Sequence, residues 1–173
     1  MKRSKFRCEI EDIPADDLIF LDESGISKNE AIEYGWAKKG ERLHDLRNSS
    51  GNKVLNLIGA LQQGKLLCPF AFEGTCDTEV FNFYLFQVLK PILNKKSVII
   101  LDNASFHRAS KIDQLCKEVG CRVIFLPPYS PDLNKIEGYW HLVKTRLRKL
   151  LRDAKGDLMD LITDVFMAIN KIA

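Results

Sequence analysis

The sequence lacks long hydrophobic runs and has few cysteines, and these absences exclude several classes of protein. No apolar segment approaches the roughly 20 residues of a membrane-spanning helix, and the basic first residues lead into the acidic stretch 9–12 rather than into a signal-peptide core. The five cysteines include no Cys-x-x-Cys pair, which excludes a small disulfide scaffold and suits a reducing compartment. We therefore expect a soluble protein of the cytoplasm.

The sequence also lacks a strong overall charge, because 26 basic and 23 acidic residues give a net charge of only +3. That value is too small to imply a polyanionic partner. The charge is unevenly distributed, however: residues 135–155 carry seven basic and two acidic side chains, a local charge of +5, so the rest of the chain sums to −2. Such a basic segment is either a solvated helix face or a surface that contacts a polyanion.

The chain does contain enough hydrophobic residues to form the core of one globular domain, since they make up 46% of its 173 residues. Its apolar patterning predicts both strands and helices. The predicted strands are 18–21, 98–101 and 123–126, as continuous apolar runs, and 54–61 with 66–72, as an antiparallel hairpin around Gly64. The predicted helices are 78–89 before Pro91, 109–119 before Gly120, 134–151 and 158–169.

This order of elements predicts an α/β fold, a mixed sheet with an antiparallel hairpin and parallel strands, flanked by helices. Sites in such sheets form where strands end. Asp22 and Asp102 each follow a buried apolar run directly, and Glu137 lies at the start of the basic helix. If that helix packs back on the sheet, the three carboxylates meet.

Three neighbouring carboxylates would raise one another's pKa unless a cation lay among them. Oxygen ligands without a thiolate favour Mg²⁺ or Mn²⁺. Two such ions about 4 Å apart support phosphodiester displacement, so the residues Asp22, Asp102 and Glu137 favour nuclease or strand-transfer chemistry. Each has a simpler interpretation: the aspartates as turn formers, and Glu137 as the partner of Asn134 in a helix capping box.

Helical geometry places two different faces on the segment 134–151. The core face is expected to hold Ile136, Trp140, Val143, Leu147 and Leu150. A second stripe holds Glu137, His141, Lys144, Arg148 and Arg152. A carboxylate followed by cations along one stripe suits a bound phosphate backbone, so we expect His141, Lys144, Arg148 and Arg152 to contact DNA.

Three segments resemble motifs of the DDE transposases, in the bacterial insertion-sequence branch of the mariner-like superfamily. They are Phe20–Gly25, Leu101–His107 and the long, specific segment Leu126–Glu137, and Gly35–Glu41 is a further similar feature. The resemblance implies a ribonuclease-H-like fold and two Mg²⁺ ions held by Asp22, Asp102 and Glu137, with Mn²⁺ as a substitute. It also implies a bacterial cytoplasmic protein, and candidates for accessory roles are Asn103, His107 and Asn134.

The resemblance further implies cleavage of double-stranded DNA at transposon ends and joining of the 3′ hydroxyl to a target, commonly at TA, by a homo-oligomer. One departure concerns DNA recognition, since family members usually carry an N-terminal helix-turn-helix region. We expect residues 1–16 to be a basic arm or linker remnant and residues 17–173 to be the catalytic domain. The chain is then either one product of a split element, with a separate helix-turn-helix polypeptide as partner, or a truncated copy.

The sequence therefore predicts the catalytic domain of a DNA transposase. Two alternatives remain open at this point. One is an inactive DNA-binding remnant of a transposase, and the other is a different ribonuclease-H-like nuclease that acts on hybrids or junctions.

Overall fold

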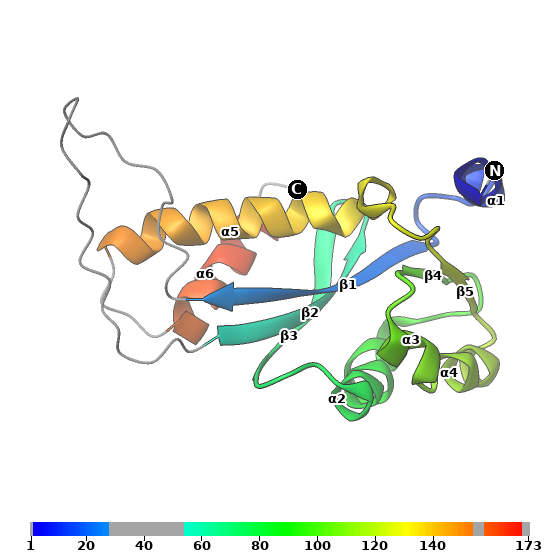
Figure 1. The fold of residues 1–173 in the computed structure, drawn as a ribbon, viewed down its shortest axis with the longest axis horizontal. Helices are drawn as coiled ribbons and strands as arrows, with labels where there is room; N and C mark the ends of the chain where they lie inside the picture. The colour runs from blue at the N-terminus through cyan, green and yellow to red at the C-terminus, as the bar shows by residue number, and fades with distance from the viewer. Residues whose placement is uncertain (1, 28–53, 154–157, 171–173) are drawn as a thin grey trace.

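The computed structural model describes residues 2–27, 54–153 and 158–170, so the motif at 35–41 lies outside the described residues. Within this part the strands form one mixed sheet in the spatial order β3-β2-β1-β4-β5. They are β1 (Leu18–Ser27), β2 (Val54–Gln62), β3 (Lys65–Glu73), β4 (Val98–Leu101) and β5 (Arg122–Phe125). β1, β4 and β5 are parallel, whereas β2 is antiparallel to β1 and β3 (Figure 1). The predicted mixed sheet is confirmed.

The hairpin between β2 and β3 turns at Gln63 and Gly64, whose φ angles are 50° and 78°. Two consecutive positive φ angles are typical of the tight type I′ turn, whose twist matches that of the adjoining antiparallel strands. Glycine adopts such a φ angle without steric cost, and this is why the sequence signal at Gly64 is reliable.

Helices flank the sheet on both faces. They are α1 (Lys2–Glu11), α2 (Thr78–Phe83), the π-helical η1 (Tyr84–Leu89), the 3₁₀ turn η2 (Lys90–Ile92), α3 (Ser105–Ala109), α4 (Ile112–Val119), the 3₁₀ turn η3 (Pro131–Leu133), α5 (Lys135–Asp153) and α6 (Leu158–Asn170). None of the helices in the described ranges combines the length and apolar character that crossing a membrane would require.

Two predicted helices differ from those observed. The first covers the predicted residues and ends at Leu89, but it is α2 followed by the π-helical η1, and Pro91 lies in the first turn of the following η2. The second, predicted for 109–119, begins only at Ile112 of α4, because Ser110 takes an extended conformation, and the sequence did not predict the preceding helix α3. Gly120 ends α4 with a φ of 82°, as predicted.

The alternation of side chains along the strands creates two hydrophobic cores. Leu18, Phe20, Val98 and Ile100 belong to the core shared with α5 and α6, whereas the intervening residues of β1 and β4 pack against α2, η1 and α4. The two helical layers lie on opposite sides of the sheet (Figure 1).

The core face of α5 is shorter than the sequence predicts. Ile136, Trp140, Val143 and Leu147 are buried. Leu150 is 40% exposed, so its prediction as a core residue is wrong. It lies one turn from the C-terminal end of α5, past Leu147, which belongs to the core.

The basic N-terminal segment forms a helix, α1, that packs on the domain. Phe6 is only 3% exposed and belongs to the core on the α5 side of the sheet. The guanidinium of Arg3 forms an ion pair with Asp132 and donates a hydrogen bond of 3.3 Å to Ser130 Oγ. These contacts fix α1 against the segment that leads into α5, and the predicted domain boundary at residue 16 stays a prediction.

Candidate active site

The two aspartates come together through the register of the parallel strands. Phe20 of β1 is level with Ile100 of β4, and Asp22 and Asp102 each follow two residues later. Because side chains alternate along a strand, Asp22 faces the same side of the sheet as Phe20, which is the side that α5 covers. Asp102 is the first residue after β4, at the same edge of the sheet. The predicted meeting of the two strand ends therefore has a simple geometric origin.

Glu137 faces Asp22 because α5 lies close to β2. Gly59 is paired with Asp22 across the β1–β2 ladder. A Cβ atom added at Gly59 would lie 2.8 Å from Leu66 Cδ1 and 3.0 Å from Trp140 Cη2. Since only glycine leaves this space, Trp140 can pack against the strand beside Asp22, and Glu137, one turn earlier on α5, lies over the end of the sheet.

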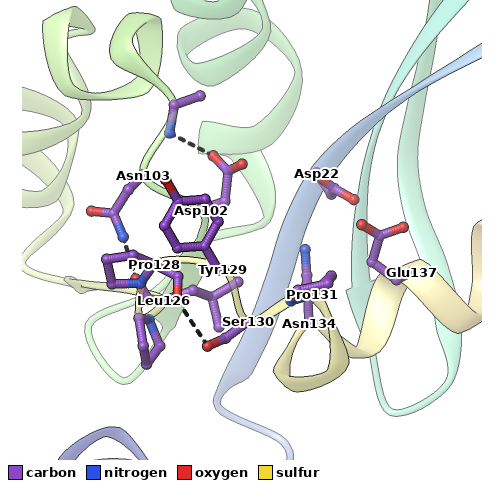
Figure 2. Close-up of a pocket in the computed structure, with 12 residues that line it drawn as sticks. Asp22, Asp102, Asn103, Leu126, Pro128, Tyr129, Ser130, Pro131, Asn134 and Glu137 are labelled. Carbon is purple, nitrogen blue, oxygen red and sulfur yellow. Dashed lines mark hydrogen bonds between the residues drawn. The ribbon is translucent and has the colours of Figure 1, made fainter. Parts of the chain in front are cut away.

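The three carboxylates line one pocket of about 450 Å³. Its other lining residues are Asn103, Ala104, Leu126, Pro127, Pro128, Tyr129, Ser130, Pro131 and Asn134. Figure 2 shows Asp22 and Glu137 facing each other from β1 and α5, with Asp102 on the far side of the gap. All of the segments that resemble transposase motifs and that the structure describes thus contribute to the same cavity.

The electrostatics of the pocket are unfavourable for three ionised acids. Asp22 is only 8% exposed. Burial, followed by the negative charges of Glu23, Glu137 and Asp102, raises the pKa of Asp22 to about 8. Near neutral pH and without a cation, Asp22 therefore holds a proton in the folded protein.

Asp102 is held by a buried histidine. The Nδ1 atom of His107 lies 2.7 Å from Asp102 Oδ1, and the backbone N–H of Ala104 donates to the same oxygen at 2.8 Å. His107 is fully buried, and its Nε2 atom lies 2.7 Å from Glu23 Oε1. Both contacts of Asp102 use Oδ1, so among the described residues Oδ2 is left for a ligand.

The charge of His107 follows from its two carboxylate neighbours. Burial disfavours the imidazolium, but hydrogen bonds and charge interactions with Asp102 and Glu23 outweigh burial and raise its pKa to about 9. The hydrogen bond from His107 in turn lowers the pKa of Asp102. At neutral pH both ring nitrogens therefore carry protons, and each donates to a carboxylate.

The side chain of Asn103 bonds to groups beside the pocket rather than pointing into its middle. Its Nδ2 donates to the carbonyl oxygen of Leu126, and its Oδ1 accepts from Arg108 Nη2. These bonds tie the loop after β4 to the segment after β5.

Asn134 does not form the capping box that its spacing from Glu137 suggests. The first bond of α5 runs from the Glu137 N–H to the Asn134 carbonyl oxygen, 3.1 Å, between backbone atoms only. Asn134 is buried, and within the described part of the chain its Oδ1 atom has no hydrogen-bond partner. A buried amide oxygen without a partner on the wall of this pocket is a candidate ligand for a cation or a water molecule.

The predicted basic stripe lies on the side of α5 away from the core. His141 and Arg148 are exposed and Lys144 is half-buried. The Arg152 side chain is outside the described part of the chain. The stripe begins at Glu137 and runs away from the pocket along α5, as predicted, and its contacts with DNA stay a prediction.

The pocket fits a divalent cation by the chemistry of its donors. Its carboxylates and the Asn134 amide are hard oxygen ligands, and burial together with neighbouring negative charge raises the pKa of Asp22, so a bound cation would favour its ionised form. Among the described residues, however, no three Asp, Glu, His or Cys side chains are close enough together to hold one ion. The reason is that Asp102 turns toward His107 and Ala104, whereas Asp22 and Glu137 face each other.

Sequence reasoning missed three residues around the pocket. Glu23 is the half-buried partner of His107, and the period of two along β1 is the signal that separates its face from that of Asp22. Arg108 packs on the Phe125 ring at 4.7 Å and bonds to Asn103. Tyr129 is 99% exposed with a φ of 54°, which no sequence pattern foretells for an aromatic residue.

Comparisons with known proteins place the chain in a family. The model of the DDE superfamily endonuclease family matches residues 17–158. An uncharacterized protein of Sinorhizobium fredii, y4pE/y4sA, is 30% identical over 113 residues, which are 61% of this chain and 80% of the relative. A 39 kDa protein of insertion element IS630 from Shigella sonnei is 28% identical over 71% of this chain and 36% of its own length.

Solved structures share the fold at low sequence identity. The Mos1 strand transfer complex matches 99% of this chain and 58% of its own chain, with a TM-score of 0.69 and 17% identity. The Mos1 transposase catalytic domain with raltegravir and Mg matches 99% of this chain and 82% of its own, with a TM-score of 0.63 and 15% identity. Compared with the IS630 protein, the chain spans little more than a third of that protein's length. On the family match and the ribonuclease-H-like fold, the protein belongs to the DDE superfamily endonucleases, a family that uses divalent metal ions.

Proposed function

We propose that this chain is the catalytic domain of a DNA transposase, which cleaves DNA at transposon ends and transfers the freed 3′ strand to target DNA. The observation that carries the proposal is the convergence of Asp22, Asp102 and Glu137 on one pocket. The three side chains come from β1, the end of β4 and the start of α5, and each falls in a segment that resembles a transposase motif.

Asp22, Asp102 and Glu137 are the proposed holders of two Mg²⁺ ions, with Mn²⁺ as a substitute. Ions bound there would lower the pKa of the attacking water or 3′ hydroxyl and stabilise the charge that develops on the scissile phosphate. The donor set supports this assignment, since it consists of hard oxygens and includes one acid whose pKa burial and neighbouring charge raise to about 8.

The protein groups around the acids fix their positions. The His107 imidazolium donates to Asp102 Oδ1, so among the described residues Oδ2 is left for a ligand. Trp140 packs against Gly59 and so sets the distance of α5, and therefore of Glu137, from the sheet. Such preorganisation matters because a displacement of about 1 Å can lower a catalytic rate about 100-fold.

The basic stripe of α5 is the proposed path of the DNA away from the catalytic pocket. Its cations would neutralise backbone phosphates, which contributes affinity without reading sequence. The members that we assign to it are His141, Lys144, Arg148 and Arg152. We further propose a homo-oligomer in the active complex, target joining at TA and, for end recognition, a helix-turn-helix region supplied by a separate polypeptide.

The assignment is tested by incubating the chain with supercoiled plasmid and with short DNA duplexes in Mg²⁺ or Mn²⁺. We expect nicking or joining that chelator abolishes, and a loss of at least about 100-fold in Asp102→Asn. The matched control is Asp164→Asn, which removes an exposed acid of α6. If wild type and Asp102→Asn act on DNA equally, the catalytic assignment is wrong, and salt-sensitive binding without cleavage would identify an inactive remnant.

Comparing duplex DNA, an RNA–DNA hybrid and a branched junction as substrates tests the remaining alternative. A preference for hybrid or junction over duplex would contradict a transposase and favour another ribonuclease-H-like nuclease.

A further inference from the structure

A second, smaller groove adjoins the catalytic pocket on the side of α1. Its volume is about 270 Å³. The groove and the catalytic pocket share four lining residues, Asn103, Leu126, Pro127 and Pro128. A chain-like ligand in the pocket can therefore continue over the Pro127–Pro128 segment into the groove without leaving the protein surface.

The walls of this groove are mainly basic. Lys2 and Lys5 from α1 and Arg108 from α3 line it, against one acid, Glu9. The edge of the buried Phe6 and the Phe125 ring, which lies under Arg108, also line it. This combination of cations and rings is typical of surfaces that bind the phosphates of a nucleic-acid strand.

Arg108 is held in place before any ligand arrives. Its guanidinium packs on the Phe125 ring at 4.7 Å, and its Nη2 donates to Asn103 Oδ1. A guanidinium presents five donors in a fixed fork, so these contacts leave N–H groups for a phosphate. Because its orientation is already restricted, less side-chain entropy is lost when a phosphate binds.

The opposite wall, α1, is held by two separate contacts. Phe6 is buried in the core, and Arg3 forms an ion pair with Asp132 in the turn before α5. The lysines that line the groove are therefore carried on a helix whose position is set by the motif segment 126–137 itself.

We propose that this groove binds the sugar–phosphate backbone of the DNA strand on the side of the scissile phosphate opposite to α5. The proposal rests on the proposed function, since it assumes that the pocket holds DNA. It gives the N-terminal helix a direct part in substrate binding, and it makes Arg108 a DNA-binding residue. DNA would then contact basic surface on both sides of the carboxylates.

The first test is lysine footprinting of the wild-type chain. The protein is treated with acetic anhydride with and without a duplex of about 30 base pairs, in Ca²⁺ so that binding is measured without turnover, and modified lysines are quantified by mass spectrometry. We expect DNA to protect Lys2 and Lys5 at least threefold more than Lys96 and Lys117, which are exposed lysines outside both cavities. Equal modification of the two pairs would overturn the proposal.

The second test compares charge-matched variants in fluorescence anisotropy over a salt series. The variant Lys5→Gln with Arg108→Gln removes two groove cations, and Lys96→Gln with Lys117→Gln removes two cations elsewhere. We expect only the groove variant to reduce the slope of log Kd against log salt, by nearly two. Arg108→Lys, which keeps the charge but not the fork, should weaken binding about tenfold with little change of slope.

The outcomes separate this proposal from the catalytic one. If wild-type protein binds DNA through the groove but does not cleave it in Mg²⁺ or Mn²⁺, the proposed function fails and the groove assignment stands. If cleavage is normal and the groove variant behaves like its control, the groove assignment fails alone. Competition by polyglutamate as effective as that by DNA would also overturn it, because the groove would then be a general acceptor of anions.

Discussion

The Nε2 atom of His107 lies 2.7 Å from the Oε1 atom of Glu23, a residue 84 positions earlier in the chain. This contact shows that two adjacent acids of β1 face opposite sides of the sheet. Asp22 faces α5 and lines the catalytic pocket, whereas Glu23 faces α3 and holds the histidine that in turn holds Asp102. The arrangement supports Asp22 rather than Glu23 as the proposed metal ligand.

The pair His107–Glu23 predicts a pH dependence of stability. A histidine whose folded pKa is raised from 6.5 to about 9 stabilises the fold fully below pH 6.5, and this contribution is lost as the pH rises through about 9. Glu23→Gln removes the charge of the carboxylate, so we expect the pKa of His107 to fall and the stability at pH 7.5 to fall by about 1–3 kcal/mol.

The measurements are imidazole titration by NMR and urea unfolding at pH 6, 7.5 and 9, with Glu11→Gln at the exposed end of α1 as the control. An unchanged titration of His107 near pH 9 in Glu23→Gln would contradict the assignment.

Asp22 should destabilise the metal-free protein at neutral pH. Its folded pKa of about 8 lies above the ordinary value of 3.8, so between these values the folded state binds more protons than the unfolded state. Stability from this group is therefore greatest below about pH 4 and falls as the pH rises toward 8. In chelator at pH 7.5 we expect Asp22→Asn to raise the free energy of unfolding by on the order of 2 kcal/mol, while Asp164→Asn changes it little. A less stable Asp22→Asn protein would show that the buried charge is already compensated.

Binding of Mg²⁺ should release a proton. Because a carboxylate must be ionised to hold a metal ion, and the Asp22 pKa is about 8, affinity should increase with pH up to about 8, by at most tenfold per pH unit. Calorimetric titrations in two buffers of different ionisation enthalpy measure the number of protons released. We expect between half a proton and one at pH 7 in wild type, and none in Asp22→Asn. Affinity independent of pH in the wild-type protein would exclude Asp22 as a ligand.

The site was predictable to the extent that it depends on periodicity and on strand ends. Continuous apolar runs ending in Asp22 and Asp102 marked buried parallel strands, and the register of β1 and β4 then left little freedom in where the two acids lie. Glu137 followed from its place at the start of the basic helix, and the resemblance of the segment 126–137 to a transposase motif selected the same residue. These signals are local, so one sequence is enough to read them.

The remainder depends on contacts between distant segments. No local pattern pairs Glu23 with His107, or packs Arg108 on Phe125 beside α1. Local rules also failed where tertiary structure overrides them. The helix predicted for 109–119 begins only at Ile112, because Ser110 is extended, and Leu150 is 40% exposed although its spacing places it on the core face of α5.

Gly59 should be required for activity although it has no side chain to react. A Cβ atom there would lie 2.8 Å from Leu66 Cδ1 and 3.0 Å from the Trp140 ring. Gly59→Val should therefore lift α5 from the sheet, displace Glu137 and reduce both Mg²⁺ affinity and DNA cleavage, cleavage by about 100-fold. The expected loss of stability is about 1–3 kcal/mol, as for other overpacked sites.

Gly138 provides the matched control, since it neighbours Glu137 on α5 and a Cβ atom added to it meets nothing within 4 Å. Gly138→Ala should stabilise the helix by about 0.5–1 kcal/mol and leave Mg²⁺ affinity unchanged. Adding Trp140→Phe to Gly59→Ala removes part of the ring that the new methyl group meets. We expect this pair to recover Mg²⁺ affinity relative to Gly59→Ala alone. Full activity in Gly59→Val would show that the position of Glu137 does not depend on how closely α5 lies on β2.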